Sequence, residues 1–337
     1  MRASRWWLLL LLAFVVLVSS CAMLRVEAAV GIEPPQKLQW HYYRNSCRDA
    51  ERYVTSQVEF YWKRDKSLAP KLIRMLYADC FVTGCDASIL LDGPYSEKTA
   101  PQSAGFLGFP MVVIDKIKQI LEERCPGVVS CADILNFAAR DAAHLAGGPS
   151  YPVLAGRRDG MSSSAASVDL PLGAALWGSA LAYFESRGLD VLDLTTLLGT
   201  GGHSMGKANC SFIADRLYNF NKTGKPDPSM DSSFLAQMRE QCPPNSKNQV
   251  YLDPDSGSSY SFSKSFYSRV LNHRAVLGID QQIGANNDSS QIAQQYDGSF
   301  EDFRKRFALS MSRMGNIKVL TGNQGEIRKN CRVVNRK

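Results

Sequence analysis

Cysteine content is the feature that most constrains what this chain can fold into. The sequence holds nine cysteines, and the first, Cys21, lies in an apolar leader. The other eight are spread from Cys47 to Cys331. An even number of cysteines in a secreted chain indicates a disulfide framework, although the pattern alone does not select the pairing. No Cys-x-x-Cys pair with a histidine partner occurs, which argues against a zinc site.

Residues 1–28 have the features of a secretory signal peptide. Arg2 and Arg5 precede an apolar run over residues 6–18, and a small-residue cleavage pattern ends at Ala28. The alternative is an uncleaved membrane anchor, but the run is shorter than the roughly 20 residues that a spanning helix needs. We therefore expect cleavage, export to the extracellular space or cell wall, no membrane attachment afterwards, and a mature domain over residues 29–337.

Composition and charge narrow the class of protein. With 337 residues, 45% apolar and 21% charged, the chain suits one large globular domain or two lobes that share a core. The net charge is +7, and loss of three arginines and one glutamate with the leader leaves +5. This charge favours loose adhesion to a polyanion such as acidic wall polysaccharide, or serves only for solubility. We see no Lys/Arg cluster with interleaved aromatic residues, so we expect no nucleic-acid partner.

The apolar spacing predicts a mostly helical fold with few, short strands. Helices are expected over residues 50–66, 68–77, 110–124, 131–146, 177–187, 193–198, 206–217 and 300–314. Loops rich in Ser, Gly and Pro are expected over residues 159–167 and 226–263. There is no internal repeat, and no linker is long enough to separate independent domains.

Oxygen-bearing residues crowd one stretch, residues 74–92. After a helical end, a loop brings two carboxylates and a hydroxyl close to backbone carbonyls, and oxygens of this kind are the ligands that calcium prefers. The candidate ligands are Asp79, Val82, Gly84, Asp86 and Ser88. Cys80 and Cys85 flank the loop and could close it.

This stretch resembles the distal motif of the secretory plant haem peroxidases (class III). Further similar segments are residues 126–135, 156–159, 313–322 and 325–331, so the resemblance extends from about residue 42 to residue 335. It implies an all-α, two-lobed haem peroxidase fold, with haem b between the lobes and four disulfides. The implied pairs are Cys47 with Cys125, Cys80 with Cys85, Cys131 with Cys331, and Cys210 with Cys242.

The resemblance also assigns site residues. His203 lies where the family places its axial haem ligand, and Asp280 where it places the acceptor of the ligand's other ring proton. Glu97 matches the residue that supports the first calcium site, and Pro171 is what remains of a segment that contacts aromatic donors. A second, weakened calcium site is implied at Ser204, Asp255, Ser258 and Ser263, where serine replaces the family's last carboxylate.

The distal residues depart from the family pattern. Arg74 matches the distal arginine, which stabilises charge as the O–O bond of peroxide breaks. Ala78 stands where the family has the catalytic distal histidine, and alanine cannot move a proton. The asparagine that orients this histidine is replaced by Gln102. Tyr77 replaces a phenylalanine, and a phenol with a pKa near 10 is a poor base at neutral pH.

These features leave three hypotheses. The first is a monomeric secreted peroxidase that reduces hydrogen peroxide and oxidises small aromatic donors, with turnover impaired by Ala78. The second is a catalytically inactive protein that binds haem and calcium and acts through wall or partner contacts. The third is a disulfide-held scaffold without haem. Glycosylation sequons begin at Asn209, Asn221 and Asn287.

Overall fold

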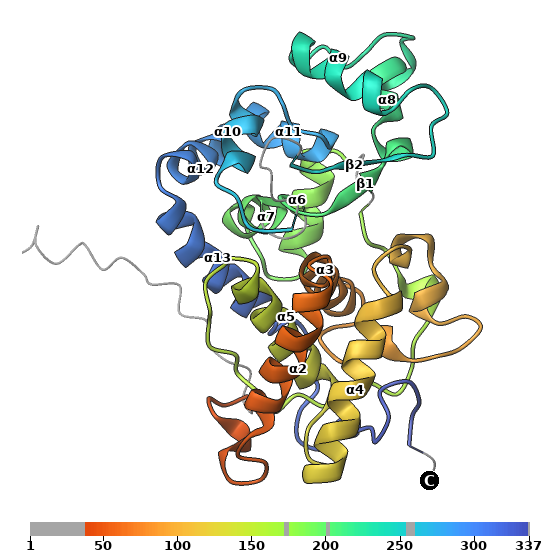
Figure 1. Cartoon of the computed structure of the whole chain (residues 1–337), viewed down its shortest axis with the longest axis vertical. Helices are drawn as coiled ribbons and strands as arrows, with labels where there is room; N and C mark the ends of the chain where they lie inside the picture. Colours follow the sequence, from red (N-terminus) through yellow and green to blue (C-terminus); the bar gives the residue numbers. More distant parts are fainter. Residues whose placement is uncertain (1–37, 172–174, 200–202, 254–259, 336–337) are drawn as a thin grey trace, which may run out of the picture. The chain divides into compact units, whose positions relative to one another are not determined.

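The computed structural model describes residues 38–171, 175–199, 203–253 and 260–335 (Figure 1). The expected signal peptide and two expected calcium ligands, Asp255 and Ser258, lie outside these ranges. Among the described residues, no helix is both long and apolar enough to cross a bilayer. They form twelve α-helices and one two-stranded sheet, which confirms the prediction of a mostly helical fold.

Four helices form a first packed group, with α5 at its centre (Figure 1). They are α2 (Ala50–Arg64), α3 (Leu68–Cys80), α4 (Gly108–Arg124) and α5 (Cys131–Leu145). α5 is buried on nearly all sides, and its buried alanines are Ala132, Ala138, Ala139, Ala142 and Ala143. Because these side chains are small, α2 and α3 can pack closely against it. The Ser130 hydroxyl caps the helix by accepting a hydrogen bond from Asp133 N at 3.1 Å.

A second group surrounds α12. Its helices are α6 (Trp177–Glu185), α7 (Val191–Leu197), α10 (Ser265–Leu271), α11 (Gly278–Ala285), α12 (Asn287–Gly298) and α13 (Phe300–Met314). The apolar stripe predicted for α13 is buried, and its rings at Phe303 and Phe307 join those of Tyr267 and Tyr296. Two packed helix groups agree with the predicted two-lobed fold. Short 3-10 helices occupy Tyr42–Arg44, Ser88–Leu90, Glu97–Thr99, Pro101–Ser103, Ala165–Ser167, Cys210–Phe212 and Phe220–Lys222.

The region after residue 203 differs from the prediction. Instead of one helix over residues 206–217, the chain forms β1 (Lys207–Asn209), a 3-10 turn and α8 (Ala214–Tyr218). β1 pairs antiparallel with β2 (Gln249–Tyr251), and β2 and α9 (Ser232–Gln241) lie within the expected loop over residues 226–263. The loop prediction was therefore wrong. α9 escaped notice because only two of its side chains, Phe234 and Met238, are buried, which leaves almost no apolar stripe.

All four predicted disulfides are present. They join Cys47 to Cys125, Cys80 to Cys85, Cys131 to Cys331, and Cys210 to Cys242. Cys131–Cys331 spans 200 residues and attaches the C-terminal segment to the start of α5. Closing a long loop removes conformational freedom from the unfolded chain, so this bond stabilises the packed arrangement.

Loss of the buried Arg157 side chain is expected to lower the free energy of unfolding by about 3–5 kcal/mol, because it leaves a buried carboxylate unpaired. Arg157 Nη1 lies 2.8 Å from Asp133 Oδ1, with side-chain exposures of 2% and 0%. Its Nε and Nη2 also donate to the Gly315 carbonyl at 2.9 and 2.7 Å. The measurement is denaturant unfolding of Arg157→Ala with disulfides intact. The neighbouring Arg158→Ala, which removes partly exposed bonds to backbone carbonyls, should cost much less; equal losses would contradict the prediction.

Candidate functional site

α3 places Arg74 and Ala78 one turn apart, on the same face of the helix. The Arg74 guanidinium lies 4.9 Å from the centroid of the Phe106 ring, and its Nη2 is 3.4 Å from the Gln102 carbonyl oxygen. Arg74 remains accessible to solvent, yet the surrounding protein lowers its pKa. The charge is therefore held in a partly enclosed position, close to the 3-10 turn that contains Gln102.

Ala78 is buried, with 1% of its surface exposed, and offers no titratable atom to that position. Tyr77 is its neighbour, and burial raises the pKa of the Tyr77 hydroxyl well above 10, an effect that the Arg74 charge offsets only in part. The phenol therefore stays protonated at neutral pH and cannot act as a base.

The loop after α3 is held in shape by its own carboxylates. Asp79 Oδ2 accepts a hydrogen bond from Ala87 N at 2.9 Å, and Asp86 Oδ1 accepts one from Ser88 N at 3.0 Å. The Cys80–Cys85 disulfide closes the base of the loop. Gly84, with φ of 121°, has a conformation that favours glycine, and a side chain there would collide with the Lys318 backbone.

Asp79, Asp86 and Glu97 are buried around this loop, near enough for their charges to act on one another. Burial and the charges of Asp86 and Glu97 raise the pKa of Asp79, and burial raises the pKa of Glu97 to about 7. Neither Glu97 oxygen has a hydrogen-bond partner of good geometry among the described residues, although the Ser88 and Ser163 hydroxyls moderate its pKa. The Arg328 charge lowers the pKa of Asp86 and Glu97 and so offsets the effect of burial only in part. Buried carboxylates of this kind suit a bound divalent ion.

Oxygens other than carboxylates must complete such a site. Within the described residues, no three Asp, Glu, His or Cys side chains converge as a metal cluster. The Ser88 hydroxyl and the backbone carbonyls of Val82 and Gly84 are the oxygens available, and calcium accepts both kinds.

Several contributors to this loop were not predicted. Gly160 N donates to the Asp86 carbonyl at 2.7 Å, and a Cβ at Gly160 would overlap the Asp86 carboxylate. The Thr83 hydroxyl lies 3.0 Å from that of Ser88, and Ser163 accepts from Glu97 N at 3.0 Å. The only available signal was the Gly160 position directly after the motif over residues 156–159.

The second cluster joins His203 to Asp280. His203 Nδ1 and Asp280 Oδ1 are 2.7 Å apart, and Asp280 lies in the first turn of α11 with 2% of its side chain exposed. This bond holds the proton on Nδ1 and leaves Nε2 as the nitrogen able to bind a metal. Tyr267, which the sequence did not identify, donates to the Thr195 carbonyl at 3.0 Å and packs against Gly199, just before His203.

Ser204 and Ser263 lie in neighbouring segments. The β1–β2 pairing continues through a 3.1 Å hydrogen bond from Leu252 N to the Gly206 carbonyl, which brings the segment of Ser204 close to Leu252. The Ser204 hydroxyl is buried without a hydrogen-bond partner among the described residues. Ser263 bonds to Ser265, whose hydroxyl donates to the buried carboxylate of Asp253 at 2.6 Å. Asp253 is not among the residues predicted from the sequence, and the predicted ligand Asp255 lies outside the described residues.

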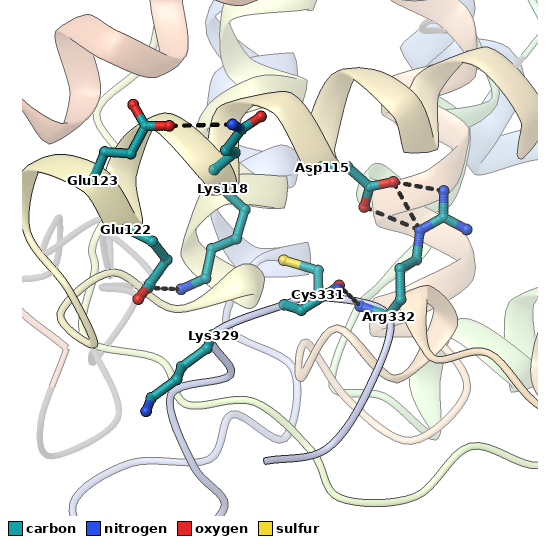
Figure 2. Close-up of a pocket in the computed structure, with 9 residues that line it drawn as sticks. Asp115, Lys118, Glu122, Glu123, Lys329, Cys331 and Arg332 are labelled. Atoms are coloured by element: carbon teal, nitrogen blue, oxygen red, sulfur yellow. Dashed lines mark hydrogen bonds and ion pairs between the residues drawn. The ribbon is translucent and has the colours of Figure 1, made fainter. Parts of the chain in front are cut away.

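Two further features stand apart. Pro171 is partly buried. A cleft of about 510 Å³ lies between α4 and the C-terminal segment. Figure 2 shows that, among the residues that line this cleft, Asp115 faces Arg332 and Lys118 faces Glu122. Its charges largely pair with one another, and it contains none of the predicted site residues.

Comparison with known proteins adds a family context. A family model described as Peroxidase matches residues 54–299. Probable peroxidase 61 of Arabidopsis thaliana is 60% identical over 332 residues, which covers 96% of this chain and 96% of that protein. Probable peroxidase 26 of the same plant is 59% identical over 92% of this chain and 93% of its own length. Peroxidase N1 of Nicotiana tabacum is 42% identical over 87% of this chain and 89% of its own length.

Proposed function

This chain belongs to the plant peroxidase family, and from that premise we propose a haem enzyme that reduces hydrogen peroxide slowly because Ala78 replaces its distal base. Its donors are phenolic-type molecules that lose one electron at a time, and Pro171 marks the expected donor edge. The observation that carries the proposal is the pairing, on one face of α3, of a retained Arg74 with a buried alanine.

The chemistry of each side chain indicates its expected role. Haem b, when bound, supplies the iron at which the O–O bond of peroxide is cleaved. His203 would hold the iron through Nε2, and Asp280 strengthens this ligand by accepting the Nδ1 proton. Arg74 stabilises negative charge on the departing oxygen. With alanine at position 78 and Tyr77 protonated, water must carry the proton that a distal histidine would otherwise move.

Absorbance and kinetics of the purified mature chain test this assignment. A Soret band after haem loading, with slow but saturable consumption of peroxide in the presence of a phenolic donor, is the expected result. Reaction at an ordinary peroxidase rate would refute the claim of impaired turnover. Absence of a Soret band would leave the scaffold without haem as the better description.

A second candidate function is a catalytically inactive protein that binds haem and calcium and acts through wall or partner contacts. The joint change of base and orienting residue, Ala78 and Gln102, favours it, as does the protonated state of Tyr77. The two candidates differ in one result, which is whether a phenolic donor is consumed above the rate of free haem.

Calcium is proposed at two places. The first site takes oxygens from Asp79, Val82, Gly84, Asp86 and Ser88, with support from Glu97, and its orphaned buried oxygens favour occupancy. The second takes Ser204, Ser263, Asp255 and Ser258, of which the last two lie outside the described residues. Since this set has fewer carboxylates, we expect weaker binding there.

Chelation of calcium is expected to lower the thermal midpoint of the native protein. A ligand at a hundredfold excess over its dissociation constant stabilises the folded state by about 2.7 kcal/mol, and this is lost when the ion is removed. The measurement is a melting curve with calcium, with chelator, and with magnesium. Magnesium should restore little of the thermal midpoint that is lost on chelation. Asp86→Asn should abolish the difference, whereas Asp288→Asn, at an exposed position on α12, should keep it. If the thermal midpoint of the native protein is the same with and without calcium, the proposed site is wrong.

The proposed setting is extracellular. Residues 1–28 would be removed as a signal peptide and residues 29–337 exported as a monomer to the cell wall, where the basic charge favours acidic polysaccharide. N-terminal sequencing of the secreted protein tests the cleavage point, and retention of residues 1–28 would refute it.

A further inference from the structure

A second cavity lies where the end of α2 meets the end of α5 and residues 260–262. Its volume is about 360 Å³. Trp62, Tyr260 and Phe262 supply aromatic walls, and Lys66 supplies a positive charge. The wall is held in place because Phe262 N donates to the Ala146 carbonyl at 2.8 Å. None of the residues that line it is assigned to iron or calcium.

Cations lie over aromatic rings in and beside this cavity. Lys66 Nζ is 3.0 Å from the centroid of the Trp62 ring. At the last residue of α2, two residues before Lys66, the Arg64 guanidinium is 3.4 Å from the centroid of the Phe60 ring, and Phe60 is 45% exposed. Aromatic faces attract cations, so these pairs present flat rings and positive charge together at the surface.

Aromatic rings and a nearby cation also lie on the other side of the cavity. The Tyr260 ring lies 6.4 Å from that of Tyr251 on β2, and Lys207 Nζ on β1 is 4.5 Å from the Tyr251 centroid. The aromatic and cationic side chains therefore extend from α2 through the cavity to the β1–β2 sheet. The sequence did not reveal this cluster, because Lys207, Tyr251 and Tyr260 are far from α2 along the chain.

These cations lack acidic partners. Neither Lys66, Arg64 nor Lys207 forms an ion pair with a carboxylate of the described residues, and no carboxylate lines the cavity. Uncompensated positive charge on a protein of net charge +7 attracts anions. A pocket with aromatic walls and a single charged group also fixes the orientation of a ring that carries one negative group.

We propose that this cavity binds an acidic saccharide chain made of uronate units. The sugar ring lies against Tyr260, its carboxylate reaches Lys66, which lies over the Trp62 ring, and the chain continues over Tyr251 towards Lys207. A neutral sugar would leave Lys66 without a partner, and a small aromatic acid would fill the cavity without reaching Lys207. The inference rests on the proposed export to the cell wall, since that is where the protein would meet such a polymer.

Calorimetric titration of the purified mature protein with a size-fractionated oligogalacturonate tests the proposal. Lys66→Gln should weaken binding by about fivefold, the effect of one exposed ion pair. Trp62→Phe should also weaken it, because the smaller ring holds the Lys66 ammonium less firmly in the cavity. Lys116→Gln removes the same charge from an exposed position on α4 and should leave the affinity nearly unchanged. The fully methyl-esterified oligomer, which lacks the charge, should bind poorly.

Three results would overturn the site. They are equal losses in Lys66→Gln and Lys116→Gln, equal affinity for the esterified oligomer, and tighter binding of 4-hydroxycinnamate or of a short single-stranded oligonucleotide. Absorbance and peroxide consumption of the same samples separate this proposal from the catalytic one. Lys66→Gln should change neither, and saccharide binding that depends on Lys66 would stand even if no peroxide were consumed.

Discussion

Replacement of Ala78 by histidine is expected to raise the rate of peroxide consumption by about 10²–10⁴-fold, the usual contribution of a positioned acid and base. The new imidazole would lie one turn from Arg74 on α3, so base and charge stabiliser would share one face. The measurement is stopped-flow absorbance of the haem-loaded, calcium-replete protein mixed with peroxide. The second-order rate constant of Ala78→His is compared with that of the native chain.

Two variants make this result specific. Ala78→Leu adds bulk without a titratable atom and should remain as slow as the native protein. Adding Gln102→Asn to Ala78→His restores the orienting amide of the family and should raise the rate beyond the single variant. Because Ala78 is buried, each variant is first checked for an unchanged Soret band and melting curve. A native rate already equal to that of Ala78→His would show that water or another group moves the proton efficiently.

Local patterns predicted most of the fold. α13 was predicted because five apolar residues recur at helical spacing; four of them are buried, and Phe300 is partly buried and packs against the core. The strand over residues 207–209 was missed because its partner, residues 249–251, is about forty residues away and no local pattern encodes that pairing. A long-range disulfide, Cys210–Cys242, further selects this arrangement over a continued helix.

The same difference between local and long-range features explains which site residues could be predicted from the sequence. The oxygens of the loop after α3 lie within ten residues of one another, so they were visible as a cluster in the sequence. Gly160 contributes through its backbone and through the absence of a side chain, which no residue pattern signals. Asp255 was predicted because it aligns with a ligand of the family, and it lies outside the described residues. The burial of Asp253 and its contact with Ser265 depend on tertiary packing, which no local pattern encodes.

Replacement of His203 by alanine is expected to abolish stable haem binding, since it removes the proposed iron ligand. Asp280→Asn keeps a hydrogen-bond acceptor for Nδ1 but removes the charge, and should weaken haem retention by about 10–100-fold. The measurements are the Soret spectrum, the iron spin state and the rate of haem transfer to an acceptor protein. Asp288→Asn, at an exposed position on the neighbouring α12, is the matched control and should behave as the native chain.

Added imidazole provides the decisive comparison for His203. The side chain is 24% exposed, so a small molecule can enter the space that His203→Ala leaves. Imidazole should then restore the native spectrum in His203→Ala, and more weakly in the double variant with Asp280→Ala, because Asp280 would accept the ring proton of the added ligand as it does that of His203. A native spectrum in His203→Ala without imidazole would instead assign the iron to one of the three other histidines, His41, His144 or His273.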